Sequence, residues 1–180
     1  MRLAVSGSHN TGKTTLIEAL IRAMPEYELV DEPYRLLEDE GVQFAHTPSL
    51  ADYELQLDRS IESITQRDGN CVFDRCPADF LAYCLGDHDS TSFQVGQWLP
   101  RVRRAMKLLD LIVFVPVEQP DRISFSEHAR LRRRVDEEIR EILLEDRWDF
   151  ASEVLEVTGT VPERLSLILD YLRAANDRRV

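Results

Sequence analysis

Nine consecutive residues near the N-terminus supply the glycines, lysine and hydroxyl groups that a phosphate chain requires. The segment runs Gly7-Ser8-His9-Asn10-Thr11-Gly12-Lys13-Thr14-Thr15 and fits the pattern G-x-x-x-x-G-K-[ST]. Glycines let successive backbone N–H groups turn toward an anion. Lys13 would then bridge the terminal phosphates, and Thr14 would offer its hydroxyl to Mg²⁺. We therefore predict that a phosphate chain is bound by Gly7, His9, Asn10, Thr11, Gly12, Lys13, Thr14 and Thr15.

The residues on either side of this segment favour the phosphate-binding interpretation over an incidental glycine-rich turn. The apolar run Leu3-Ala4-Val5 precedes it, and an apolar pattern of helical spacing begins at Leu16. A strand before the loop and a helix after it are the context that the motif requires. Lys13 and Lys107 are the only lysines in the chain. The loop thus keeps a compact point charge where the chain otherwise uses arginine.

Acidic residues follow two further apolar segments. Tyr27–Val30 runs into Asp31-Glu32-Pro33, and Cys71–Phe73 runs into Asp74-Arg75. In an open parallel sheet the carboxyl ends of the strands face the ligand crevice. Asp31 and Glu32 are either general-base candidates or solvated acids that cap the next helix, and both alternatives stay open. Asp74 is a candidate ligand of Mg²⁺ beside Thr14, and Arg75 would bind a phosphate or orient an acceptor.

A cluster of arginines opens a helix expected over 127–148. At about 100° per residue, Arg132 falls inside the apolar stripe of that helix, and Arg130, Arg133 and Arg134 fall outside it. We expect Arg133 and Arg134 to form surface pairs with nearby acids. An arginine at an inward position requires an anion, so Arg132 is predicted to meet one.

The elements that position these residues alternate between strands and helices. Strands are expected at 3–5, 27–30, 71–73, 111–115 and 154–157, and helices from 13 to about 24 and at 34–40, 48–67, 79–85, 93–109, 127–148 and 162–175. A polar loop is expected at 86–92. The alternation predicts a doubly wound α/β fold with a parallel sheet and right-handed crossovers.

The length, net charge and hydrophobic content of the chain bear on its domain number and on whether it binds nucleic acid or a membrane. The 180 residues suit a single domain, 1–180, and the net charge of −11 argues against broad nucleic-acid binding. No apolar run approaches the length of a membrane span, and we expect a cytoplasmic protein. Cys71, Cys76 and Cys84 lack metal-site spacing, which favours reduced packing residues.

Together these motifs resemble the P-loop nucleoside and nucleotide kinases, especially deoxynucleoside and thymidylate kinases and nicotinamide riboside kinase domains. Val30-Asp31-Glu32-Pro33 is similar to the segment whose glutamate is the general base, and Phe73-Asp74-Arg75-Cys76 to the Asp/Glu-Arg-Ser segment that holds magnesium and works beside the phosphates. The resemblance implies a sheet order of 2-3-1-4-5 with helices on both faces, and an arginine-bearing lid over about 117–136. It assigns catalytic roles to Lys13, Glu32, Arg75 and Arg132, metal binding to Thr14 and Asp74, and nucleotide contacts to Arg130 and Thr158.

The implied reaction is transfer of the γ-phosphoryl group of ATP, with Mg²⁺, to a hydroxyl or phosphate of a small acceptor, a nucleoside or nucleotide. A GTPase is disfavoured because no lysine has the Asn/Thr-Lys-x-Asp spacing. An ATP-dependent regulatory or binding ATPase remains the alternative. Monomer and homodimer both stay open.

Overall fold

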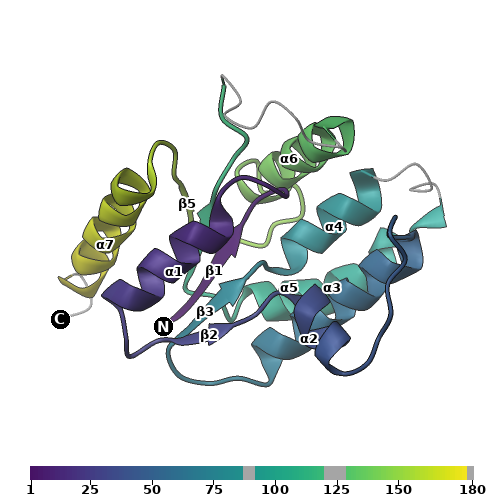
Figure 1. The fold of residues 1–180 in the computed structure, drawn as a ribbon, viewed down its shortest axis with the longest axis horizontal. Coiled ribbons are helices and arrows are strands. Elements are labelled where there is room, and N and C mark those ends of the chain that lie inside the picture. The colour runs from purple at the N-terminus through teal and green to yellow at the C-terminus, as the bar shows by residue number, and fades with distance from the viewer. Residues whose placement is uncertain (87–91, 120–128, 178–180) are drawn as a thin grey trace.

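The computed structural model describes residues 1–86, 92–119 and 129–177, which form five strands and seven helices (Figure 1). In chain order the elements are β1 (Arg2–Ser6), α1 (Lys13–Ala23), β2 (Glu28–Val30), α2 (Pro33–Asp39), α3 (Leu50–Thr65), β3 (Cys71–Asp74), α4 (Pro77–Gly86), α5 (Val95–Met106), β4 (Leu111–Phe114), α6 (Ala129–Leu143), β5 (Val154–Glu156) and α7 (Val161–Asp177). Most of the polar loop expected at 86–92, and the centre of the lid expected at 117–136, lie outside the described residues.

All five strands pair in parallel, in the order β2-β3-β1-β4-β5, which confirms the predicted α/β class and sheet order. Strand β1 is central, because Ala4 lies beside Phe73 of β3 on one side and Ile112 of β4 on the other. Strand β4 and the centre of β1, Leu3-Ala4-Val5, are continuous apolar runs because helices cover both faces of the sheet. The crevice therefore opens at the carboxyl end of β1, where the glycine-rich loop begins.

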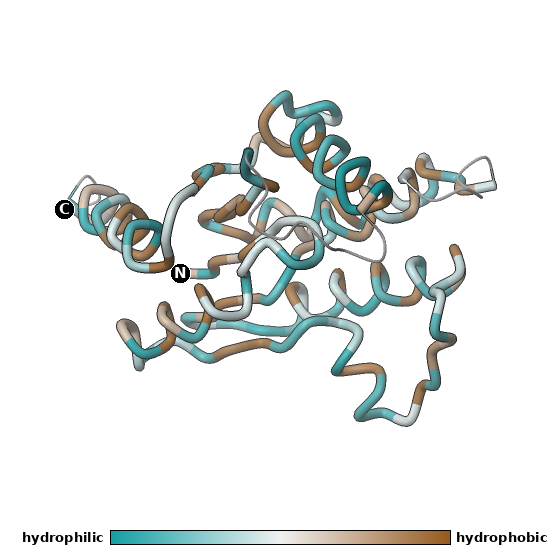
Figure 2. The backbone as a smooth tube through the Cα atoms, turned by 45° about the horizontal axis from the view of Figure 1, so that its top comes forward, coloured by the Kyte–Doolittle hydropathy of each residue, from teal (hydrophilic) through white to brown (hydrophobic). Residues whose placement is uncertain are grey.

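Helices form a layer on each face of the sheet. Figure 1 shows α1 and α7 on one side and α3 to α6 on the other. Each layer has its own core: Leu16 and Ile168 belong to the first, and Leu57 and Val102 to the second. Figure 2 shows hydrophobic and hydrophilic residues alternating along the helices. The helices thus turn an apolar stripe to the sheet and a polar face outward.

Several boundaries differ from those expected. Helix α6 ends at Leu143 and not at 148, because Asp146 and Asp149 adopt positive φ angles of 48° and 52° that a right-handed helix excludes. Helix α4 begins at Pro77, since a proline suits the first turn. Helix α3 begins after Ser49, whose side chain caps the N–H of Asp52. Among the described helices, none has the length and apolarity to span a membrane.

Candidate active site

The glycine-rich loop holds a conformation that requires its glycines. Gly12 lies in the left-handed region at φ 87°, directly before α1, and no side chain caps the start of that helix. A Cβ on Gly7 would lie 2.3 Å from the carbonyl oxygen of Val115, so a side chain is excluded there. The N-terminus of α1 thus presents uncapped backbone N–H groups and the positive end of its dipole.

Lys13 is buried beneath this loop. Its Nζ donates to the carbonyl oxygen of Ser8 over 2.6 Å. Burial and then the charge of Arg75 lower the pKa of Lys13 to about 7, although three nearby carboxylates oppose the shift. An ammonium group in this position gains from an additional negative charge, which a phosphate chain in the loop would supply.

Asp74 stands at the carboxyl end of β3, beside Val5 of β1. Its Oδ1 is buried and has no hydrogen-bond partner, and burial raises the pKa of its carboxyl to about 6, with Arg75 opposing the shift. A divalent cation would provide the missing partner, and Thr14 is an exposed residue at the start of α1. The described residues contain no group of three or more His, Cys, Asp or Glu side chains that could hold a metal. One carboxylate and one hydroxyl fit Mg²⁺, which takes its remaining ligands from phosphates and water.

Glu32 and Asp31 differ in their exposure and in their partners. The carboxylate of Asp31 is exposed and lies 4.0 Å from Arg35. The side chain of Glu32 makes no capping hydrogen bond to α2, and its Oε2 accepts from the Nε of Arg75 over 3.2 Å. Glu32 is therefore not a solvated helix cap, and of the two acids it is the one paired to the residue that follows β3.

Arg75 connects Glu32 to the glycine-rich loop, residues 7–15, which is called the phosphate loop below. It adopts φ 80°, and its Nη1 donates to the carbonyl oxygen of Gly7 over 3.0 Å and lies 3.5 Å from Asp79. Its guanidinium carbon lies 5.5 Å from the centre of the Tyr83 ring. The loop, the end of β2 and the start of α4 thus meet at one buried guanidinium.

Sequence reasoning missed two residues of α4 that hold the loop from the same side. The Oδ1 of Asp79 accepts the backbone N–H of Gly7 over 2.9 Å, and the hydroxyl of Tyr83 accepts the N–H of His9 over 3.1 Å. The spacing of four residues, which places both side chains on one helical face, was a usable signal. Asp79 also accepts the N–H of Cys76 at the start of α4, so from sequence it resembles an ordinary first-turn acid.

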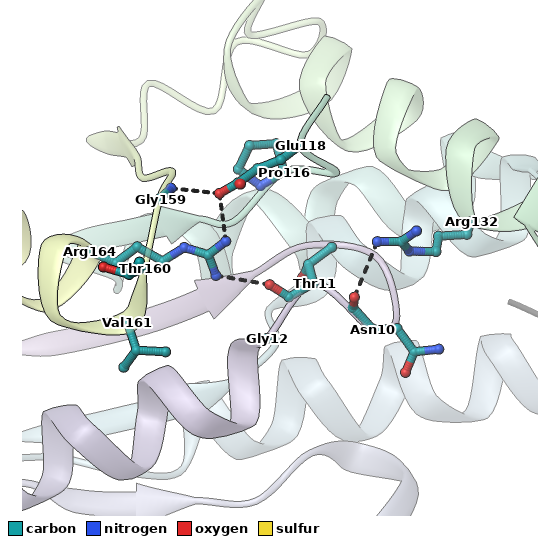
Figure 3. Close-up of a pocket in the computed structure, with 10 residues that line it drawn as sticks. All are labelled: Asn10, Thr11, Gly12, Pro116, Glu118, Arg132, Gly159, Thr160, Val161 and Arg164. Carbon is teal, nitrogen blue, oxygen red and sulfur yellow. Dashed lines mark hydrogen bonds and ion pairs between the residues drawn. The ribbon is translucent and has the colours of Figure 1, made fainter. Parts of the chain in front are cut away.

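Arg132 is buried, as its inward position predicted, and it donates to two carbonyl oxygens of the loop. Its Nε donates to the carbonyl oxygen of His9 over 2.9 Å. Its Nη2 donates to the carbonyl oxygen of Asn10 over 3.1 Å (Figure 3). Arg130 is exposed on α6. The three cysteines are buried free thiols, which confirms their prediction as packing residues.

Two cavities flank the loop. One, of about 330 Å³, will be called the loop-side cavity and is lined by Asn10, Thr11, Gly12, Pro116, Glu118, Arg132, Gly159, Thr160, Val161 and Arg164. Thr158 is not among its lining residues, although its two successors are. The other, of about 260 Å³, will be called the Glu32 cavity and is lined by His9, Glu32, Tyr34, His46, Pro48, Tyr53, Gln56, Arg75, Phe80, Tyr83 and Leu131.

The loop-side cavity contains an ion pair that the sequence did not reveal. Arg164 of α7 is buried, and its two terminal nitrogens donate to the carbonyl oxygen of Thr11 over 2.9 Å and to Glu118 over 2.8 Å (Figure 3). The same Glu118 oxygen accepts the N–H of Gly159 over 2.6 Å. The loop after β4, the loop after β5 and the phosphate loop are thereby held together.

Comparisons with known proteins identify a family and a shared fold. A family model described as an AAA domain matches residues 2–164. No curated protein sequence matches the chain.

Solved structures of P-loop kinases share the fold. Deoxyadenosine kinase from M. mycoides with bound dATP is 14% identical with a TM-score of 0.66, over 96% of this chain and 99% of that one. Thymidylate kinase from Candida albicans is 16% identical with a TM-score of 0.64, over 97% and 92%. The NadR protein in complex with NR is 20% identical with a TM-score of 0.61, over 88% and 43%. At these identities the likeness shows a P-loop kinase fold, as the motifs predicted.

Proposed function

The chain belongs to the AAA domain family, and on the basis of its site we propose that it transfers the γ-phosphoryl group of ATP to a small acceptor, a nucleoside or a nucleotide.

The observation that carries the proposal is the pair of cavities on either side of one phosphate loop. Asn10, Thr11 and Gly12 line the loop-side cavity, and His9 lines the Glu32 cavity. A nucleotide whose phosphates lie in the loop can place its base in the first cavity, with its terminal phosphate facing the second. A regulatory ATPase has no need of a second cavity with its own carboxylate, whereas a phosphotransferase must hold an acceptor there.

Each charged residue then has a role in the transfer. Lys13 and Arg75 lie where they neutralise charge on the transferred group, since phosphoryl transfer requires mostly positioning and electrostatic stabilisation. Mg²⁺, held by Asp74 and Thr14, would neutralise phosphate oxygens. Glu32 is the proton acceptor for a hydroxyl acceptor, and Arg132 steadies the loop through two of its carbonyl oxygens.

The proposal is tested by acceptor-stimulated release of ADP. The purified chain is given ATP and Mg²⁺ with nucleosides, nucleoside monophosphates and nicotinamide riboside, and ADP is followed in a coupled assay. A phosphotransferase releases ADP in proportion to the acceptor consumed, and Lys13→Ala lowers this rate by about a hundredfold or more. ADP release that no acceptor changes would instead identify a regulatory ATPase.

A further inference from the structure

Side chains hold the backbone carbonyl groups of the phosphate loop. Every carbonyl oxygen from Gly7 to Thr11 accepts a side-chain hydrogen bond of 2.6 to 3.2 Å. The donors are Arg75 to Gly7, Lys13 and Thr11 to Ser8, Arg132 to His9 and Asn10, and Arg164 to Thr11. In a planar trans peptide the N–H points away from the C=O of the same plane. A side chain that fixes one of these carbonyl groups therefore also fixes the N–H of the next residue.

Arg164 fixes the peptide plane between Thr11 and Gly12. Its Nη1 donates to the carbonyl oxygen of Thr11 over 2.9 Å, and a Cβ on Gly12 would lie 3.3 Å from the same nitrogen. The guanidinium thus packs against the residue that precedes α1. The N–H of this plane belongs to Gly12, and within the described part of the chain no group accepts a hydrogen bond from it. Arg164 therefore sets the direction of an N–H at the start of α1, where an anion is favoured.

Glu118 holds Arg164 in this position. The Nη2 of Arg164 donates to the Oε1 of Glu118 over 2.8 Å, and the same oxygen accepts the N–H of Gly159 over 2.6 Å. The side chains of Arg164 and Glu118 are only 7% and 16% exposed. Because a guanidinium is a rigid planar fork, fixing Nη2 on Glu118 also fixes Nη1 on the loop.

The contact of Arg164 is on the carbonyl side of this peptide. A phosphate that accepts the N–H of Gly12 lies on the opposite side, because the two groups of a trans peptide point in opposite directions. Arg164 therefore acts on that phosphate through Gly12 and not by contact. Arg164 also lines the loop-side cavity, so a direct contact with the base is the alternative that an experiment must separate.

We infer that Arg164 is a positioning residue for the phosphate chain of the nucleotide, which it serves by directing the N–H of Gly12; this inference rests on the proposed function, in which that chain lies in the loop. Glu118 contributes at one remove, because it holds the guanidinium. The loss caused by removing Arg164 falls on the phosphate chain, whatever base is attached to it.

The test compares ATP with inorganic tripolyphosphate, which has a phosphate chain and no base. The Kd of each, with Mg²⁺, is measured by calorimetry for the full chain and for Arg164→Gln, below the Tm of both proteins. We expect the substitution to raise both Kd values by the same factor, about tenfold, as is typical of a residue that acts on a ligand through another group. In the ADP-release assay the KM for ATP should rise and the KM for the acceptor should stay unchanged.

Two further variants separate positioning from a general loss of stability. Glu118→Gln leaves Arg164 in place but removes the charge that holds it, so both Kd values should rise several-fold. This variant also carries the test if Arg164→Gln does not fold. Ile168→Val is the control, because Ile168 lies one turn further along α7 and is buried in the core beside α1. It should lower the Tm and change neither Kd.

The outcomes distinguish this inference from the proposed function. A Kd that rises for ATP and not for tripolyphosphate would make Arg164 a contact of the base, which overturns the inference and leaves the proposed function standing. Unchanged Kd values for both ligands in folded Arg164→Gln and Glu118→Gln would overturn it in the same way. A wild-type chain that binds neither ligand would overturn the proposed function, and the inference with it.

Discussion

The carboxylate of Asp79 accepts a hydrogen bond from the backbone N–H of Gly7 over 2.9 Å, and both groups are buried. The residues are 72 positions apart, and the contact attaches α4 to the first residue of the phosphate loop. Its other oxygen accepts the N–H of Cys76 over 2.9 Å. One carboxylate therefore sets the position of the loop relative to the end of β3.

Asp79→Asn tests this attachment. An asparagine has one oxygen for two buried N–H donors, so one donor loses its partner, at a cost of about 1–3 kcal/mol in the free energy of unfolding. The affinity for ATP should fall as well, because the loop loses an anchor. Denaturant unfolding and nucleotide titration measure the two effects. The matched control is Asp170→Asn, which removes an exposed acid paired with Arg173 and should change neither quantity.

Asp74→Asn is expected to stabilise the metal-free protein above pH 6 while weakening its use of Mg²⁺. Burial raises the pKa of Asp74 from 3.8 to about 6, so the folded state binds this proton more tightly than the unfolded chain. The ionised carboxyl therefore costs stability increasingly as pH rises from 3.8 through 6, and the cost is fully present above that range. Asparagine carries no such cost.

The measurement for Asp74 is the difference in Tm between variant and wild type across this pH range without metal. The variant should melt higher at pH 7.5, and the difference should shrink as pH falls toward 4. Half-maximal activity should require about tenfold more Mg²⁺ in the variant. A Tm difference that is independent of pH would contradict the assigned cost, and an unchanged Mg²⁺ requirement would contradict the metal role.

Glu32→Gln should separate proton acceptance from binding. Glutamine keeps the size and hydrogen-bonding capacity of the side chain, and loses the charge that takes a proton. We expect kcat with an alcohol acceptor to fall by about 10² to 10⁴, while the Kd for ATP stays nearly unchanged. Asp31→Asn is the control, since Asp31 is exposed and next in sequence. An unchanged kcat in a folded Glu32→Gln protein would leave Glu32 as a structural partner of Arg75 alone.

Arg132→Ala should loosen the phosphate loop before any nucleotide binds. The side chain donates to the carbonyl oxygens of His9 and Asn10, so its loss should speed hydrogen exchange over 7–13 in the free protein. Arg133→Ala, one residue along and exposed, serves as the control. In the wild type, exchange around 130–135 should slow with an ATP analogue and Mg²⁺ if the helix also closes over the phosphates. Unchanged exchange in the loop of the Arg132 variant would contradict its bracing role.

The sequence by itself determined the phosphate loop and the alternation of strands and helices, since both depend on contiguous residues. Gly12 and Lys13 act through residues a few positions away, and the apolar runs at the centre of β1 and in β4 are typical of strands buried on both faces. The loop pattern therefore predicted which residues carry the charge. The helical periodicity of 127–148 also predicted that Arg132 points inward, because the direction of a helical side chain follows from its angle around the helix axis.

Only the tertiary structure decided which partners these side chains meet. Asp31 and Glu32 are adjacent and chemically alike, and the choice between them depends on Arg75, 43 residues further along the chain. Arg132 donates to two carbonyl oxygens of the loop more than 120 residues away, and Arg164 donates to the carbonyl oxygen of Thr11 across 153 residues. Hydrogen bonds across such separations arise when strands order themselves in the sheet and bring their loops to one edge. Local spacing carries no record of that pairing, because a side chain's distant neighbours are set by packing and not by its position in the chain.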